Sequence, residues 1–235
     1  MNEPQAADFV VSNFISLETQ LLDCMEFIPF IDGNKEIVSP KFIPIIMDSC
    51  SLIDSILNSF ADGKPERYNL KKYAEMYEPS LEFETNISLF LSSPIKPMTP
   101  FSGWTKGQPS WWAAYNAIKL DRLNNYKEAK FINAATALAG LHQVMSRFKA
   151  FIGAFLRVGW LDTSEIETLA DLGSVAHLGA LHPQPPSLVV ESRLFVSASR
   201  DNFVKSFDDF YFDIDYDTNG ISSRVRNLLF AHEEW

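Results

Sequence analysis

Apolar residues recur at every third or fourth position along much of the chain, which is the spacing of an amphipathic helix. Ser39 and Asn69 are suited to cap two of these segments, because their side-chain oxygens can accept hydrogen bonds from free backbone N–H groups. The longest apolar stripe lies in residues 127–156, and this segment is expected to lie in the core of the fold. The pattern predicts helices over about 6–30, 39–60, 69–77, 109–123 and 127–156, with shorter ones over about 162–176 and 225–229.

A second pattern, in which apolar and polar residues alternate, is typical of a half-buried strand. It occurs over residues 81–91 and again over 210–217, where aromatic residues alternate with aspartates. Residues 187–196 are rich in valine and also predict a strand. The proline- and glycine-rich stretch 94–107 predicts a loop.

Together these elements predict a predominantly α-helical protein with a minor β element, in the α+β class. Its helical bundle core is expected over residues of about 109–157, within a single domain formed by residues 1–235. The chain contains only 10 glycines in 235 residues. This low content argues against sandwiches and dinucleotide-binding sheets, which use glycine at turns and phosphate loops.

Charge is unevenly distributed along the chain. The formal net charge is −10, but residues 103–157 carry 8 basic and 2 acidic side chains, between two flanking segments that are each at −8. We call residues 103–157 the basic island. Two interpretations remain open, since the island either balances the acidic flanks within the fold or faces an anionic ligand.

The cellular environment is predicted to be the cytoplasm. Cys24 and Cys50 are too few for a disulfide framework, and the N-terminus lacks the basic start and apolar run of a secretion signal. The longest uncharged apolar stretch, residues 131–146, is shorter than the roughly 20 residues of a membrane span. No membrane association is therefore expected. No cofactor is expected either, because the common phosphate-loop, dinucleotide and metalloprotease motifs are absent.

The most distinctive string is Pro-Ser-Trp-Trp-Ala-Ala-Tyr-Asn-Ala-Ile-Lys-Leu-Asp-Arg, over residues 109–122. It resembles a run found in uncharacterised bacterial proteins, and it is similar to a degenerate form of the signature of HEPN-type helical domains. That resemblance implies an Arg that holds a scissile phosphate and a His that acts in acid–base cleavage of RNA, often in a dimer cleft. In this chain Tyr115 and Leu120 occupy those two positions.

Because leucine cannot transfer a proton, the resemblance implies a non-catalytic binding or interaction protein. Tyr115, Asn116, Lys119 and Arg122 are the candidate binding residues, and the basic island would face RNA, a nucleotide or an acidic protein partner. The resemblance also implies a homodimer. The alternative is that the aromatic residues of this string are ordinary core residues of a buried helix.

Two further hypotheses concern the C-terminal region. Arg226 and His232 have the loose spacing of the HEPN signature, which suggests a metal-independent ribonuclease of the toxin or phage-defence kind. Residues 215–220 match the first half of a calcium loop, with Asp215, Asp217 and Asn219 as oxygen ligands. However, Arg226 stands at the twelfth position, where such a loop needs a glutamate, so an acidic strand followed by an Asn-Gly turn is the simpler interpretation.

Overall fold

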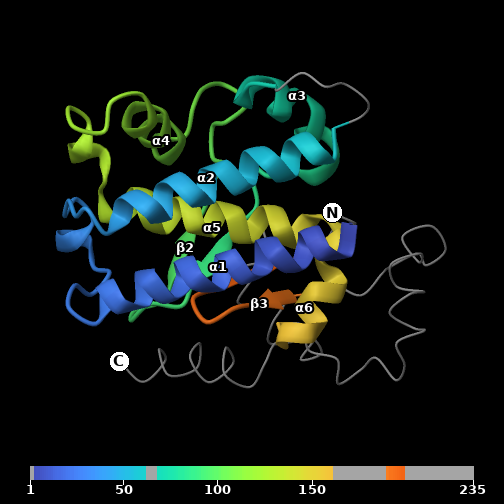
Figure 1. Ribbon diagram of the computed structural model, residues 1–235, viewed down its shortest axis with the longest axis horizontal. Coiled ribbons are helices and arrows are strands. Elements are labelled where there is room, and N and C mark those ends of the chain that lie inside the picture. The colour runs from blue at the N-terminus through green and yellow to red at the C-terminus, as the bar shows by residue number, and fades with distance from the viewer. Residues whose placement is uncertain (1–2, 62–67, 161–188, 199–235) are drawn as a thin grey trace.

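The computed structural model describes residues 3–61, 68–160 and 189–198. These residues form six packed α-helices and a small four-stranded antiparallel sheet, so the predicted α+β class is confirmed. In Figure 1, α1 and α2 run along one face, with α5 between them and the sheet behind. The helices are α1 (Glu3–Met25), α2 (Phe42–Ser59), α3 (Leu70–Leu81), α4 (Ser110–Leu120), α5 (Phe131–Arg147) and α6 (Ile152–Val158). Three short 3-10 helices are η1 (Asp32–Asn34), η2 (Tyr126–Glu128) and η3 (Lys149–Phe151).

Helix α5 forms the centre of the structure, as its apolar stripe predicts. Every residue of α5 except Ile132 and Thr136 is buried. It packs against α1, α2, α4 and strand β4, so it is enclosed on all sides. Alanine and Gly140 occupy many of its positions, and such small residues allow the neighbouring helices to approach closely.

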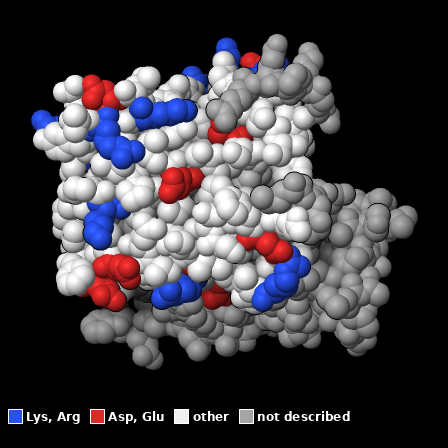
Figure 2. Space-filling view, viewed as in Figure 1, with Lys and Arg blue, Asp and Glu red and all other residues white. Residues whose placement is uncertain are grey.

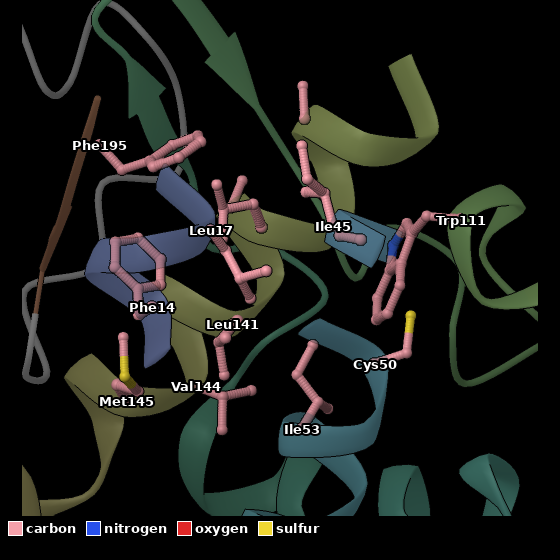
Figure 3. Close-up of a cluster of buried hydrophobic side chains, with 14 of the residues drawn as sticks. Phe14, Leu17, Ile45, Cys50, Ile53, Trp111, Leu141, Val144, Met145 and Phe195 are labelled. Atoms are coloured by element: carbon pink, nitrogen blue, oxygen red, sulfur yellow. The ribbon is translucent and has the colours of Figure 1, made fainter. Parts of the chain in front are cut away.

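The core around α5 draws side chains from five elements, and Figure 3 shows part of it. Aromatic rings extend this core: Phe42 stacks on Phe131 with ring centroids 5.0 Å apart, and Phe90 stacks on Phe195 at 5.1 Å. Burial raises the pKa of the Cys50 thiol well above its usual value, and both cysteines are free. The labelled residues are Phe14 and Leu17 from α1, Ile45, Cys50 and Ile53 from α2, Trp111 from α4, Leu141, Val144 and Met145 from α5, and Phe195 from β4.

The ends of two helices differ from the sequence prediction. Asn69 caps α3 as predicted, since its Oδ1 accepts a hydrogen bond from the Lys72 backbone N–H at 2.9 Å. The helix nevertheless continues through Pro79 to Leu81, where it ends at Glu82 with a left-handed φ of 45°. Pro79 has no N–H to donate, so one helical hydrogen bond is lost, and only Ser80 and Leu81 follow it in the helix.

The single helix predicted over residues 127–156 is wrong. The chain leaves the helix at Phe148, which is extended, and continues as η3 and α6. This break lets the Phe148 ring stack on Phe60 at 4.5 Å and meet Tyr77 edge-on at 5.7 Å. The packing of one large ring therefore overrides the local preference for a continuous helix.

The strands are shorter than predicted and differently placed. The sheet has the order β2-β1-β4-β3, with β1 (Ser88–Phe90), β2 (Lys96–Met98), β3 (Val189–Glu191) and β4 (Phe195–Ala198). The strand predicted over 81–91 is reduced to β1, because its first half is the end of α3 and a turn. The segment predicted as one strand over 187–196 contains β3 and the start of β4, which pair as a hairpin. Strand β2 lies in the predicted loop, and the predicted strand at 210–217 lies outside the described residues.

Helix α2 is long and apolar enough to cross a membrane by length and composition alone, although no such helix was expected from the sequence. Its apolar character has another cause in this fold. Eight of its residues are buried, and it packs mainly against α5, with further contacts to α1 and α4. We therefore interpret α2 as a core helix.

Gly140 provides a test of how closely α4 and α2 approach α5. A Cβ atom added at Gly140 would lie 3.5 Å from Pro100 and from Trp111, and 3.6 Å from Ile53, which are ordinary contact distances. We expect Gly140→Ala to raise the free energy of unfolding by about 0.5–1 kcal/mol, because alanine favours the helix and fits the space. We expect Gly140→Leu to lower it by about 1–3 kcal/mol through overpacking.

Urea unfolding of the two variants beside the wild type measures both effects. If Gly140→Ala were as destabilising as Gly140→Leu, the helices would have to lie closer together than this packing indicates.

Candidate interaction surface

The candidate binding residues lie on α4 and on the turn that follows it. The buried half of α4 is fixed by its tryptophans, since the Trp111 indole N–H donates to the Pro100 carbonyl oxygen at 2.6 Å. At the other end, Asp121 is extended and ends the helix, and the Asn125 side-chain amide donates to the Ala117 carbonyl oxygen at 3.0 Å. These two hydrogen bonds hold the two ends of α4 in place before the chain turns back into α5.

The structure brings two of the four predicted residues together. Tyr115 is buried, with its ring 5.4 Å from that of Trp112, and its hydroxyl accepts a hydrogen bond from Lys119 Nζ at 3.2 Å. Asn116 is half-buried, whereas Arg122 is exposed beyond the end of the helix. The core interpretation therefore holds for Tyr115, while Lys119 and Arg122 are available at the surface.

The turn itself is held by Asp121. Its Oδ1 accepts a hydrogen bond from the Asn124 backbone N–H at 3.1 Å, and its other oxygen accepts one from the Asn124 side-chain amide. These hydrogen bonds, that to the side-chain amide first, hold the pKa of Asp121 below its usual value. Asp121 is therefore occupied within the turn, and among the described residues no carboxylate lies within ion-pair distance of Arg122.

The exposed apolar side chains of this turn were not predicted. Leu120 is 86% exposed, Leu123 is 85% exposed and Tyr126 is about half exposed. They lie between the cationic side chains of Lys119, Arg122 and Lys127. We call residues 119–127 the basic turn. Leu120, which replaces the catalytic histidine in the HEPN resemblance, is thus a surface side chain rather than a core residue.

The basic turn is followed by residues whose backbone is hydrogen-bonded to the connection between α1 and α2. Just after the turn, Lys130 forms an isolated antiparallel β-bridge with Val38 in this connection. The Phe131 N–H donates to the Ile37 carbonyl oxygen at 2.9 Å, and the Ser39 N–H donates to the Ala129 carbonyl oxygen at 3.1 Å. The α1–α2 connection and the α4–α5 connection therefore lie together at one end of the molecule, on the left in Figure 1.

Sequence reasoning missed a buried polar chain on the opposite side of α5. The His142 ring is fully buried, and its Nδ1 lies 2.9 Å from the Ser197 hydroxyl, which in turn lies 2.8 Å from the Ser88 hydroxyl. Rings of Phe14, Trp160 and Phe195 surround the imidazole. Burial lowers the pKa of His142 to about 3, so the imidazole is neutral at physiological pH.

A second buried group, Glu18 of α1, lies against the β3–β4 hairpin. One of its carboxylate oxygens accepts hydrogen bonds from the Ser192 hydroxyl at 2.6 Å and from the Leu194 backbone N–H at 2.8 Å. Burial raises the pKa of this carboxyl, against the lowering effect of these hydrogen bonds. Both Glu18 and His142 lie within apolar stripes of their helices, and this was the signal in the sequence that could have identified them.

These buried groups hold the sheet to the helices rather than forming a reactive site. His142 and Glu18 have essentially no exposed surface, so neither can meet a substrate in this arrangement. Within the part of the chain that the structure describes, no group of three His, Cys, Asp or Glu side chains could hold a metal ion. Arg226, His232 and the calcium hypothesis at residues 215–220 lie outside the described residues, so those calls stay predictions.

Comparison with known proteins finds no match for this chain. No protein-family model, no curated protein and no solved structure matches the chain. The resemblance to HEPN-type domains therefore stays a hypothesis that depends on the string at 109–122 alone.

The buried His142 predicts a specific dependence of stability on pH. Its pKa is about 3 in the folded protein and 6.5 in the unfolded chain, so below pH 6.5 the unfolded state binds a proton that the folded state excludes. Each pH unit below 6.5 should then lower the free energy of unfolding by up to about 1.4 kcal/mol. His142→Phe removes this titration and keeps a large ring in the pocket.

We expect the difference in unfolding free energy between wild type and His142→Phe to fall by about 2 kcal/mol from pH 7 to pH 5. Urea unfolding of both proteins at the two pH values measures it. The two proteins differ only at position 142, so the difference between them isolates the titration of this residue. A difference that does not change with pH would mean that the His142 ring reaches solvent.

Proposed function

We propose that this chain is a non-catalytic interaction protein that binds an acidic protein partner through the basic turn. The observation that carries the proposal is the exposure of Leu120 and Leu123 between the cations Lys119 and Arg122. Large apolar side chains exposed together on a protein surface commonly mark a contact site for another macromolecule.

The mixture of side chains favours a protein over RNA. Surfaces that bind nucleic acid combine cations for the phosphates with aromatic rings or guanidinium groups that stack on bases. The basic turn offers Tyr126 and Arg122 for such stacking, but its two most exposed apolar side chains are leucines, which contribute little to either contact. Against a protein partner, each buried leucine contributes up to about 1.5–3 kcal/mol, whereas an exposed ion pair contributes about 0–1 kcal/mol.

The two kinds of side chain therefore have different roles in the proposed contact. The leucines supply most of the affinity, and the cations favour an acidic partner and speed its association. No proton-transferring group is needed, which agrees with leucine at position 120 and with the role of Tyr115 Oη as a hydrogen-bond acceptor for Lys119.

A labelled helical peptide with leucine and glutamate on one face is a direct probe. We expect the full chain to bind it, and we expect Leu123→Ser to weaken binding by about tenfold, which corresponds to about 1.4 kcal/mol. Arg122→Glu should weaken binding mainly by slowing association, and this effect should shrink at high salt. Fluorescence anisotropy and stopped-flow mixing measure the two effects.

Lys71→Glu is the matched control, because Lys71 is an exposed cation on α3, outside the basic turn. It should bind the peptide like the wild type. Tighter binding of single-stranded RNA than of the peptide, unaffected by Leu123→Ser, would instead support a nucleic-acid partner and overturn the proposal.

A further inference from the structure

The cations of the basic turn lack acidic counterparts in the described part of the chain. Lys119, Arg122 and Lys127 form no ion pair with a described residue, and the one carboxylate of the turn, Asp121, is engaged by Asn124. In Figure 2, Lys and Arg side chains gather at the upper left, over α4 and the turn that follows it. The basic turn thus keeps its positive charge and its exposed leucines available for a ligand.

The same chain contains a segment with the opposite charge and a high apolar content. Residues 207–217, which lie outside the described residues, read Phe-Asp-Asp-Phe-Tyr-Phe-Asp-Ile-Asp-Tyr-Asp. They combine five aspartates with six aromatic or aliphatic residues and contain no lysine or arginine. We call residues 207–217 the acidic segment. No other part of the sequence carries carboxylates at this density.

The two kinds of side chain in the acidic segment match the two kinds in the basic turn. Three cations and one carboxylate give the turn a net charge of +2, against −5 for the segment. Contact with Leu120 and Leu123 would also take aromatic surface of the segment out of water. The leucines therefore supply apolar contact, and the surrounding opposite charges give the pairing its selectivity.

Other surfaces of the described chain suit the acidic segment less well. Helices α1 and α2 contain no lysine or arginine, and their only charged side chains are carboxylates, which would repel the aspartates. Several cations elsewhere already have acidic partners, namely Lys35 with Asp32, Lys130 with Glu36 and Arg157 with Asp8. The basic turn instead combines unpaired cations with exposed leucines.

The acidic segment is close enough along the chain to reach the basic turn. Eight residues, 199–206, separate it from the end of β4, so the nine residue steps span up to about 30 Å. Ser197 of β4 contacts His142, which lies about 17 Å along α5 from its start. Since α5 packs against both β4 and α4, two packing distances of about 10 Å each separate those elements. The two components combine to about 26 Å, which the connection can span.

We propose that the acidic segment binds the basic turn of its own chain and competes there with the acidic protein partner. This inference rests on the proposed function, because it describes how the same site is regulated. The covalent connection gives the segment an effective concentration on the order of 1 mM at the turn. If the segment occupies the turn for about nine-tenths of the time, the apparent affinity for a partner falls about tenfold.

Binding of the leucine–glutamate peptide to variants of the full chain tests the competition. The double variant Asp209→Asn with Asp213→Asn removes two of the five charges of the acidic segment and leaves the basic turn intact. We expect it to bind the peptide about three- to tenfold more tightly than the wild type, because the turn is then occupied less often. The matched control, Asp48→Asn with Glu75→Gln, removes two exposed carboxylates from α2 and α3 and should bind like the wild type.

A zero-length cross-link detects the same contact in the wild-type protein. A carbodiimide joins a lysine amine to a carboxylate that touches it, with loss of one water. We expect cross-links from Lys119 or Lys127 to aspartates of the acidic segment, identified by mass spectrometry and suppressed at high salt. An equal mixture of chains with light and heavy nitrogen shows whether each link lies within one chain. Links that mainly join a light chain to a heavy one would assign the contact to a second copy and overturn the inference.

Failure of the inference can be distinguished from failure of the proposed function. If the segment variant binds the peptide no better than the wild type and no link joins the segment to the turn, the inference is overturned while the function stands. A wild type that binds the peptide poorly beside a segment variant that binds it well supports both. If neither protein binds the peptide and no link forms, both fail.

Discussion

The packing of α5 is the constraint on which the rest of the structure depends. A helix whose residues are buried on nearly every face needs a neighbour on each side, and here these are α1, α2, α4 and β4. Small residues such as Gly140 set the spacing of those neighbours, since a Cβ added there would already touch α2, α4 and the loop residue Pro100.

Enclosing α5 also explains the buried polar groups. Its sheet-facing side contains His142, whose Nδ1 needs a partner when it leaves water, and the Ser197–Ser88 pair supplies one across β4 and β1. Glu18 performs a related role from α1, where its carboxylate accepts two hydrogen bonds from the turn between β3 and β4. These contacts fix the hairpin in one position against the helices, which apolar packing alone specifies less well.

The sequence allowed the helices to be predicted better than the strands, for a physical reason. The stripe of α5 and the Asn69 cap are local signals, and both appear in the structure. The break at Phe148 is not local, because it depends on Phe60 and Tyr77 from other helices. Likewise, all three residues of β1 are buried, so the alternation over 81–91 arose from a helix end and a turn instead of a half-buried strand.

The candidate site was only half predictable for the same reason. Lys119 and Arg122 were identified because they belong to the HEPN-like string within the basic island, and the sequence displays both features directly. The exposure of Leu120 and Leu123 was not identified, because apolar residues in a helical pattern are ordinarily assigned to the core. Here Leu120 is the last residue of α4, Asp121 ends the helix before Leu123, and the Asn124 hydrogen bonds hold the turn in that form.

The two interpretations of the basic island are therefore less opposed than they first seem. Part of the island balances charge within the fold, as Lys130 does with Glu36 and Arg157 with Asp8. The remainder lies in the basic turn beside the exposed Leu120 and Leu123, where three cations accompany one carboxylate. This local positive charge in an acidic chain favours an acidic partner. A partner that offers both apolar side chains and carboxylates would be complementary to this surface.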